Sequence, residues 1–103
     1  MVVIEWTELA RADFVSAIAV VAAERNQEAA MHLFDRVADE VGLLADNPFR
    51  GEIGRVTATR ELSVTGHDYF VAFTVLPARV VVLRLLSALA PGTDRTVGPE
   101  STS

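Results

Sequence analysis

The sequence predicts a two-layer α+β domain with the element order βααβββ, in which a helical hairpin packs on a small antiparallel sheet. Three observations support this prediction. A short β-branched run opens the chain, apolar residues then recur every three or four positions up to residue 44, and from residue 57 their spacing drops to two. We expect one domain over residues 1–90. Residues 91–103 have no periodicity, and we expect them to form a flexible C-terminal tail.

The first strand and the first helix are predicted within residues 2–25. Val2–Trp6 is rich in β-branched residues, which favour strands. Thr7 carries a hydroxyl that can accept a hydrogen bond from a free amide at a helix start. Helical spacing then relates the apolar residues Ala10, Phe14, Ile18 and Val21. We expect this helix to end near Arg25.

A second helix is predicted to start at Asn26, which is a favoured N-cap residue. Its apolar stripe consists of Ala30, Leu33, Phe34, Val37, Val41 and Leu44. The helix should stop before Asn47–Pro48, because proline disfavours helical geometry in the preceding residue. Two helices with matching stripes and a very short break predict an antiparallel hairpin.

Three strands should follow the loop at residues 49–54. Alternation predicts one strand over residues 57–64, and apolar β-rich runs predict others over 69–76 and 80–86. Turn residues separate them at 65–68 and at Pro77–Ala78. Strands that are joined directly should pair antiparallel as a meander.

One face of this sheet has no predicted helix to cover it. The last strand offers two alternating sets, and an arginine rarely lies in a dry core. We therefore expect Val80, Val82, Arg84 and Leu86 to face outward, and Val81, Leu83 and Leu85 to face inward. Exposed apolar patches usually mark partner sites. The predicted partner-binding residues are Arg60, Tyr69, Val80, Val82, Arg84 and Leu86.

Composition limits the possible classes of protein. The chain has 103 residues, is 50% apolar and contains no cysteine, which fits one core without disulfides or thiolate metal sites. Glu5 precedes any long apolar run, so the N-terminus does not resemble a signal peptide. Residues 69–90 are apolar, but Pro77, Arg79 and Arg84 favour two strands and a turn over a membrane span. We expect a soluble, cytoplasmic protein with no membrane partner.

The charge is distributed unevenly along the chain. The net charge is −5, and residues 1–48 alone carry nine acids against three arginines. An acidic first half does not suit general nucleic-acid binding, so no direct DNA binding by the chain alone is expected. Every basic residue is arginine, which favours planar contacts with phosphate or carboxylate.

No set of residues makes a convincing catalytic or metal site, and no cofactor is expected. The two histidines, His32 and His67, lack further ligands at metal-binding spacing and are interpreted as surface residues. Arg55, Arg60 and Arg84 could each pair with an acid such as Glu52 or Glu61, or grip an acidic partner or phosphate. For Arg55 the ion pair is favoured; for Arg84 both interpretations stay open.

The order of several short motifs resembles the ParE/RelE superfamily of toxins from bacterial toxin–antitoxin pairs. The likeness covers about residues 3–88 and is carried by Trp6-Thr7, Glu28-Ala29-Ala30, Phe34-Asp35-Arg36-Val37, Asn47-Pro48, Gly54-Arg55-Val56, Thr59-Arg60-Glu61-Leu62, Tyr69 and Val82-Leu83-Arg84-Leu85-Leu86. This resemblance implies a small toxin that a cognate antitoxin neutralises, in a hetero-oligomer with it.

The resemblance also implies a choice between two targets. ParE-like members act on DNA gyrase, and RelE-like members cleave mRNA on the ribosome. Cleaving members place an Arg after the third-strand Tyr, where this chain has Phe70, and basic residues beyond the last strand, where it has Ala88-Leu89-Ala90-Pro91. The ParE-like side is therefore favoured. A ribosome-dependent endoribonuclease and an inactive antitoxin-binding module remain the alternatives.

Overall fold

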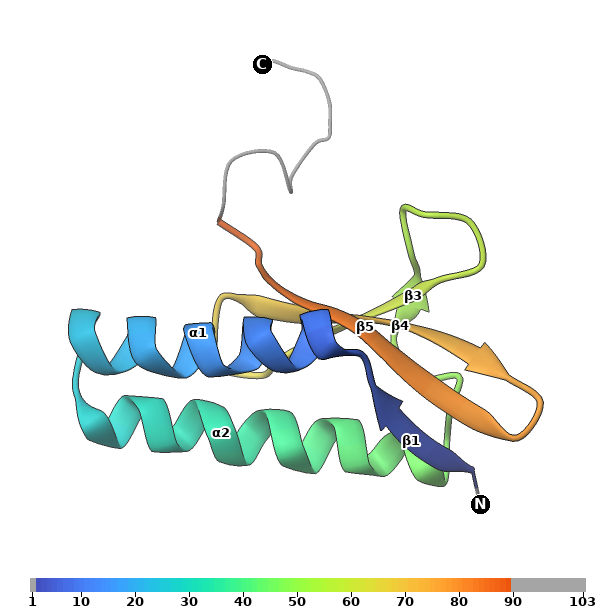
Figure 1. The fold of residues 1–103 in the computed structure, drawn as a ribbon, viewed down its shortest axis with the longest axis horizontal. Helices are drawn as coiled ribbons and strands as arrows, with labels where there is room; N and C mark the ends of the chain where they lie inside the picture. The colour runs from blue at the N-terminus through green and yellow to red at the C-terminus, as the bar shows by residue number, and fades with distance from the viewer. Residues whose placement is uncertain (1, 90–103) are drawn as a thin grey trace, which may run out of the picture.

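Two antiparallel helices pack on one face of a five-stranded sheet in residues 2–89, the part of the chain that this computed structural model describes (Figure 1). The elements are β1 (Val3–Trp6), α1 (Glu8–Glu24), α2 (Gln27–Gly42), the 3-10 turn η1 (Leu43–Ala45), β2 (Glu52–Ile53), β3 (Arg60–Ser63), β4 (Tyr69–Leu76) and β5 (Arg79–Ser87). The predicted α+β class is confirmed. The predicted tail, residues 91–103, lies outside the described residues. Between residues 2 and 89, no helix is long and apolar enough to cross a membrane.

The two predicted N-caps set where the helices begin. The Thr7 Oγ1 atom accepts a hydrogen bond from the Ala10 amide at 3.0 Å, and the Asn26 Oδ1 atom accepts one from the Ala29 amide at 2.7 Å. Each cap satisfies one of the amides that a helix start leaves without an intrahelical partner. The Thr7 hydroxyl also donates to the Leu83 carbonyl at 3.0 Å, so the start of α1 is tied to β5.

The sheet is mixed, with the strand order β1-β5-β4-β3-β2. Strands β2 to β5 pair antiparallel as the meander prediction requires, but β1 pairs parallel with β5. The prediction of a purely antiparallel sheet is therefore wrong for this pair. A tight turn forces neighbouring strands to run antiparallel, whereas the helical hairpin after β1 leaves the direction of that strand free.

The strand predicted over residues 57–64 is shorter in the structure. Residues 54–59 form a loop in which Ala58 has a φ of 68°, a left-handed conformation that a strand does not contain. The Gly54 amide bonds to the Thr59 carbonyl at 2.8 Å and closes this loop. The loop joins β3 to the two-residue strand β2, an element that the sequence did not predict.

A β-bulge in β5 changes which side chains face the helices. Phe73 lies opposite Val82, but the preceding residue of β4, Ala72, lies opposite Arg84, so Leu83 is the additional residue. Val80 and Val82 are fully buried in the helix-side core, so the prediction that they face outward is wrong. Val81 and Leu83, which were expected to face inward, lie on the other face, where Leu83 lines a cavity with Arg84 and Leu86. The additional residue reverses the alternation of side chains beyond the bulge. Leu85 therefore lies in the core, while Arg84 and Leu86 lie on the other face.

The core lies between the helical hairpin and the sheet. Its largest fully buried side chains come from both layers: Phe73, Leu33, Leu44, Val37, Val71, Val80 and Val82. On the opposite face of the sheet no helix packs, as the layer arrangement in Figure 1 shows for the described residues. This asymmetry determines where a partner can reach the sheet.

Candidate partner-binding surface

The helix-free side of the sheet presents an apolar surface, which we call the open sheet face. It is formed by side chains of β4 and β5, namely Phe70, Ala72, Leu83, Arg84 and Leu86. Together with Arg55, Val56, Thr59 and Glu61 of the β2–β3 segment, these residues line a cavity of about 280 Å³. Arg84 and Leu86 thus lie together among apolar side chains on the exposed face, as predicted for these two residues.

Arg84 is held in place by Asp13 of α1. The Arg84 Nε atom donates to the Asp13 Oδ2 atom at 2.7 Å, and the Nη2 atom donates to Oδ1 at 3.1 Å. The Leu85 amide donates to the same Oδ2 atom at 3.1 Å. Such a two-point contact fixes the plane of the guanidinium. The Arg84 side chain is still 40% exposed, so it can contact a partner while its orientation is already set.

The electrostatic surroundings stabilise both charges of this ion pair. Burial raises the pKa of Asp13, but the hydrogen bonds from Arg84 and from the Leu85 amide outweigh burial and leave that pKa below its ordinary value. The hydrogen bond to Asp13 raises the pKa of Arg84. The ion-pair alternative for Arg84 is thus present in the structure, with Asp13 in place of the acids that the sequence suggested.

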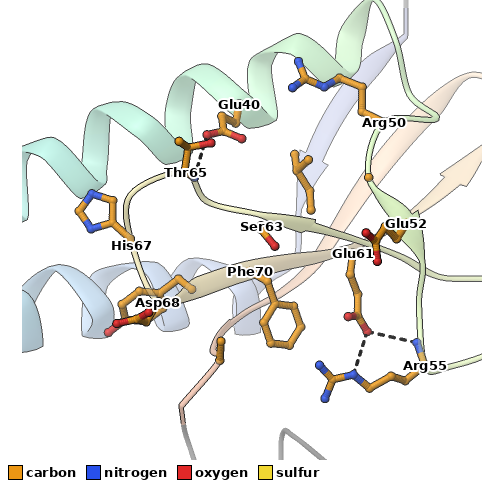
Figure 2. A pocket seen from close by; sticks show the side chains of 14 residues that line it. Glu40, Arg50, Glu52, Arg55, Glu61, Ser63, Thr65, His67, Asp68 and Phe70 are labelled. Atoms are coloured by element: carbon orange, nitrogen blue, oxygen red, sulfur yellow. Dashed lines mark hydrogen bonds and ion pairs between the residues drawn. The ribbon is translucent and has the colours of Figure 1, made fainter.

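Arg55 and Glu61 form the boundary between the open sheet face and a second cavity. The Glu61 Oε2 atom accepts from the Arg55 amide at 3.1 Å and lies 3.5 Å from the Arg55 Nε atom, as the dashed lines in Figure 2 show. The Arg55 guanidinium carbon lies 5.2 Å from the centre of the Phe70 ring. This cation–π contact lets Phe70 be buried on a face that has no helix.

The second cavity, of about 550 Å³, is lined mainly by polar side chains and is called the polar cavity here (Figure 2). Glu40 of α2 borders it and accepts a hydrogen bond from the Thr65 amide at 3.0 Å and one from the Arg36 Nη2 atom at 2.8 Å. Burial raises the pKa of Glu40, and these hydrogen bonds lower it below its ordinary value. Glu40 therefore joins α2 to the turn between β3 and β4.

The remaining predicted site residues lie elsewhere. Arg60 is on the helix side of the sheet, opposite Phe73, and donates to the carbonyls of Phe49, Arg50 and Gly51. Tyr69 is half-buried against the core and lines the polar cavity, where burial and the charges of Glu24 and Asp68 raise its pKa. Of the predicted set, only Arg84 and Leu86 line the cavity of the open sheet face.

Sequence reasoning did not identify two acids, Asp13 and Glu40, that hold other residues of the site in place. Asp13 stands three residues after Ala10 and four before Ala17, and both alanines are buried on one face of α1. Glu40 likewise stands three residues after Val37 and four before Leu44, which are both buried. An acid that interrupts an apolar stripe should have a buried partner, and this rule would have identified both.

The two histidines, His32 and His67, contact each other. The His32 Nδ1 atom lies 2.8 Å from the His67 Nε2 atom, and the ring centres are 5.0 Å apart. Burial lowers the pKa of His67, and electrostatic interactions with His32, Arg25 and Arg36 lower it further, while Asp68 opposes them. Within residues 2–89 no three histidines or acids are placed to hold a metal ion.

Comparisons with known proteins identify the family and the fold. The sequence profile described as "ParE toxin of type II toxin-antitoxin system, parDE" matches residues 4–89. No curated protein gives a sequence match. A solved structure described as a chromosomal ParDE TA system from P. aeruginosa has a TM-score of 0.75 and 21% identity, covering 84% of this chain and 96% of that chain.

Two structures of an E. coli protein, YafQ, share the fold more distantly. The DinJ-YafQ complex has a TM-score of 0.55 and 13% identity, and it covers 84% of this chain and 93% of that chain. A point mutant of YafQ has a TM-score of 0.54 and 14% identity with the same coverage, 84% and 93%. The profile match spans almost all of the described residues. The chain therefore belongs to the ParE toxin family of type II toxin–antitoxin systems.

Proposed function

We propose that this toxin acts by protein–protein contact, with DNA gyrase as its target, and that a cognate antitoxin neutralises it. The family match over residues 4–89 supports a type II toxin. The choice of gyrase follows from the resemblance to ParE-like members noted in the sequence. The open sheet face supplies a surface for protein contact, since it combines apolar side chains with an arginine in fixed orientation.

Burial of Phe70 is the structural observation that most favours this proposal over RNA cleavage. The position that carries an Arg in RNA-cleaving relatives of the superfamily is here an apolar ring, 7% exposed and covered by Arg55. Phosphate-stabilising chemistry needs a cation aimed at the scissile bond. At this position the ring takes the place of that cation, and the nearest guanidinium is engaged with Glu61.

An in vitro supercoiling assay tests the target. Purified toxin added to gyrase and relaxed plasmid should reduce supercoiling in a concentration-dependent way, and addition of the antitoxin should restore it. Relaxation by a type I topoisomerase, measured at the same toxin concentrations, is the control for non-specific DNA effects. Complete supercoiling at saturating toxin would contradict the proposal.

Two further measurements separate the alternatives. Primer extension on an mRNA translated in the presence of the toxin would show cleavage in the ribosomal A site if the chain is an endoribonuclease. Expression without antitoxin would leave growth unchanged if the chain is an inactive antitoxin-binding module. The gyrase proposal requires an intact transcript in the first experiment and arrested growth in the second.

A further inference from the structure

A pair of facing histidines joins α2 to the turn between β3 and β4. The His32 Nδ1 atom and the His67 Nε2 atom lie 2.8 Å apart, which is within hydrogen-bond distance. The ring of His32 also lies against the turn itself, because a Cβ atom added at Gly66 would stand 3.8 Å from its Cε1 atom. The contact therefore holds the two central residues of the turn, Gly66 and His67, against the helix.

The geometry of this pair fits a proton better than a metal ion. The ring centres lie 5.0 Å apart, close to the N···N distance plus the distance from each ring centre to its own nitrogen. The two nitrogens therefore point at each other along one line. A zinc ion on that line would lie about 2.0–2.1 Å from each nitrogen and would separate the two by about 4 Å. The observed distance leaves room for one hydrogen atom between the rings.

The number of protons on the pair decides whether the contact can form. A neutral imidazole offers one donor and one acceptor, whereas a histidinium ion has donors at both ring nitrogens. The hydrogen bond therefore forms when both rings are neutral, and also when one ring is charged and donates to the other. A second added proton places two N–H groups face to face, so that two cations repel each other.

The charged groups around the pair oppose this second proton in sum. On α2, the groups one helical turn from His32 are Glu28, Asp35 and Arg36; beside the turn are Arg25, at the end of α1, and Asp68. Burial lowers the pKa of His67, and His32, Arg25 and Arg36 lower it further, while Asp68 opposes them. Because the unfolded chain binds this proton more readily, the stability contributed by the contact is complete above the ordinary value of 6.5. It is lost as the pH falls from there through the lower pKa of the folded chain.

Both ends of the turn are attached by groups that do not titrate in this range. The Thr65 amide donates to the Glu40 carboxylate at 3.0 Å. Burial raises the pKa of Glu40, but the hydrogen bonds from Thr65 and Arg36 bring it below its ordinary value of 4.5, so Glu40 stays charged. At the other end, the Ala88 amide donates to the Asp68 carbonyl at 2.8 Å. Loss of the histidine contact therefore frees only the middle of the turn.

We propose that His32 and His67 form an acid-sensitive latch, which one proton between the rings closes at neutral pH and a second protonation opens. Opening releases Gly66 and His67 from α2. His67 and Asp68 line both the polar cavity and a smaller cavity of about 170 Å³ that reaches Arg25. The latch therefore controls the wall that these two cavities share. It involves neither gyrase nor an antitoxin, so its test is independent of the proposed function.

Nuclear magnetic resonance of the full chain tests the latch between about pH 8 and pH 5, where histidines titrate. The two rings should titrate in two separate steps, because the second proton enters a pair that is already charged. With the second step, the backbone order parameters of Gly66 and His67 should fall from about 0.85 to below about 0.6. That of Thr65, which stays bonded to Glu40, should not change.

Replacement of one histidine by glutamine separates the charge from the hydrogen bond. Glutamine can still donate or accept, but it does not titrate. In His32→Gln we expect His67 to titrate in one step, and the order parameters of Gly66 and His67 to become independent of pH. His67→Gln should make the order of Gly66 independent of pH in the same way. Met31→Gln is the matched control, since it makes the same replacement at the 52% exposed neighbour of His32 and should retain both steps.

Four results would overturn the proposal. Titration of both rings in a single step near the ordinary value of 6.5, with an ordered turn throughout, would mean that the histidines are not coupled. A pH-dependent loss of order that persists in His32→Gln would assign it to another group. A simultaneous loss of order at Thr65 and in the middle of β4 would be acid unfolding of the whole domain. A shift of both ring signals by equimolar Zn²⁺ at neutral pH would make the pair a metal site.

Discussion

Asp13 fixes the side chain of Arg84 and also bonds to the backbone of β5. Its carboxylate accepts hydrogen bonds from the guanidinium and from the Leu85 amide, just after the bulge. Here β5 has passed the end of β1, whose last paired residue lies opposite Val82. The Asp13 carboxylate therefore bonds to the backbone of β5 at a position where β1 no longer pairs with it.

We expect Asp13→Asn to lower the free energy of unfolding by about 1–2 kcal/mol at pH 7. This range is reduced from that of a fully buried charged pair because the Arg84 side chain is 40% exposed. The pKa of Asp13 is lower in the folded chain than its ordinary value of 3.8. Its contribution is thus complete above that value and is lost as the pH falls through the folded-state pKa. Urea unfolding at neutral and acidic pH measures the change.

The exposed acid Asp39 supplies the control, because Asp39→Asn should change the free energy of unfolding by less than about 0.5 kcal/mol. A destabilisation by Asp13→Asn that is equally large well below the folded-state pKa would contradict the prediction. It would mean that the shape of the carboxylate, and not its charge, is responsible.

Two neighbouring valines test which side chains of β5 face the helices. Val82 is fully buried between the layers, whereas Val81 is half-buried on the other face. We expect Val82→Ala to lower the free energy of unfolding by about 2 kcal/mol, through lost burial and the remaining cavity. Val81→Ala should cost less than about 1 kcal/mol. Chemical denaturation of both variants provides the comparison, and the reverse ranking would refute the observed bulge.

At single positions, sequence reasoning succeeded where the pattern was continuous and failed at the bulge. The rule that an arginine faces away from a dry core placed Arg84 and Leu86 correctly. It failed for Val80 and Val82 because the alternation was carried through Leu83, where one additional residue reverses the phase. An apolar run that is rich in β-branched residues contains nothing that marks such an insertion.

At the scale of the elements, Glu40 is the main link between α2 and the β3–β4 turn. It is 5% exposed and bonds to both Arg36 and the Thr65 amide. The turn has a second link to α2, the contact between His32 and His67. Turns that lack buried apolar contacts open locally with low free energies, so these two polar links determine how firmly the turn is held.

We expect Glu40→Met to lower the free energy of unfolding by about 1–3 kcal/mol, because it leaves the Thr65 amide and Arg36 without their acceptor. Hydrogen exchange at the Thr65 amide should become at least tenfold faster. Amides in the middle of β4 should keep their protection relative to the global stability. Asp39→Met, which makes the same replacement at the exposed neighbour, is the matched control. Unchanged exchange at Thr65 would show that the histidine contact alone holds the turn.

The elements that the sequence predicted best are those with local determinants. Thr7 and Asn26 cap the helices where expected, because capping involves residues only three positions apart. The parallel pairing of β1 with β5 joins residues more than seventy positions apart, and no local pattern encodes it. The short strand β2 also depends on a distant partner, β3, and was interpreted as part of a loop.

On the scale of the whole molecule, the two layers differ in extent and leave two uncovered surfaces. The helices do not cover the open sheet face, and the sheet does not cover the end of α2 beside β1. The first surface was predicted from the number of helices. The second surface could not be predicted, because it depends on the position of β1 at the edge of the sheet and on the groove between β1, α1 and α2.

The two surfaces make separable predictions for antitoxin binding. Leu86→Lys places a charge on the open sheet face, beside Arg84, without altering the helix-side core. If an antitoxin covers this face, we expect at least a tenfold loss of affinity in calorimetric titration with the antitoxin, since a charge without a partner is costly in an apolar interface. Ala19→Lys, on the exposed side of α1, should bind normally.

A second variant separates the two surfaces. Gly42→Leu fills the apolar groove beside β1, which is lined by Ile4, Trp6, Phe14, Ala38, Val41 and Gly42. Normal binding by Leu86→Lys together with weak binding by Gly42→Leu would confine the antitoxin to this groove. The open sheet face would then remain free for the toxin's target, and toxin and target could associate while the antitoxin is bound. Loss of affinity in both variants would instead mean that one antitoxin spans both surfaces, so that neutralisation works by direct occlusion of the target surface.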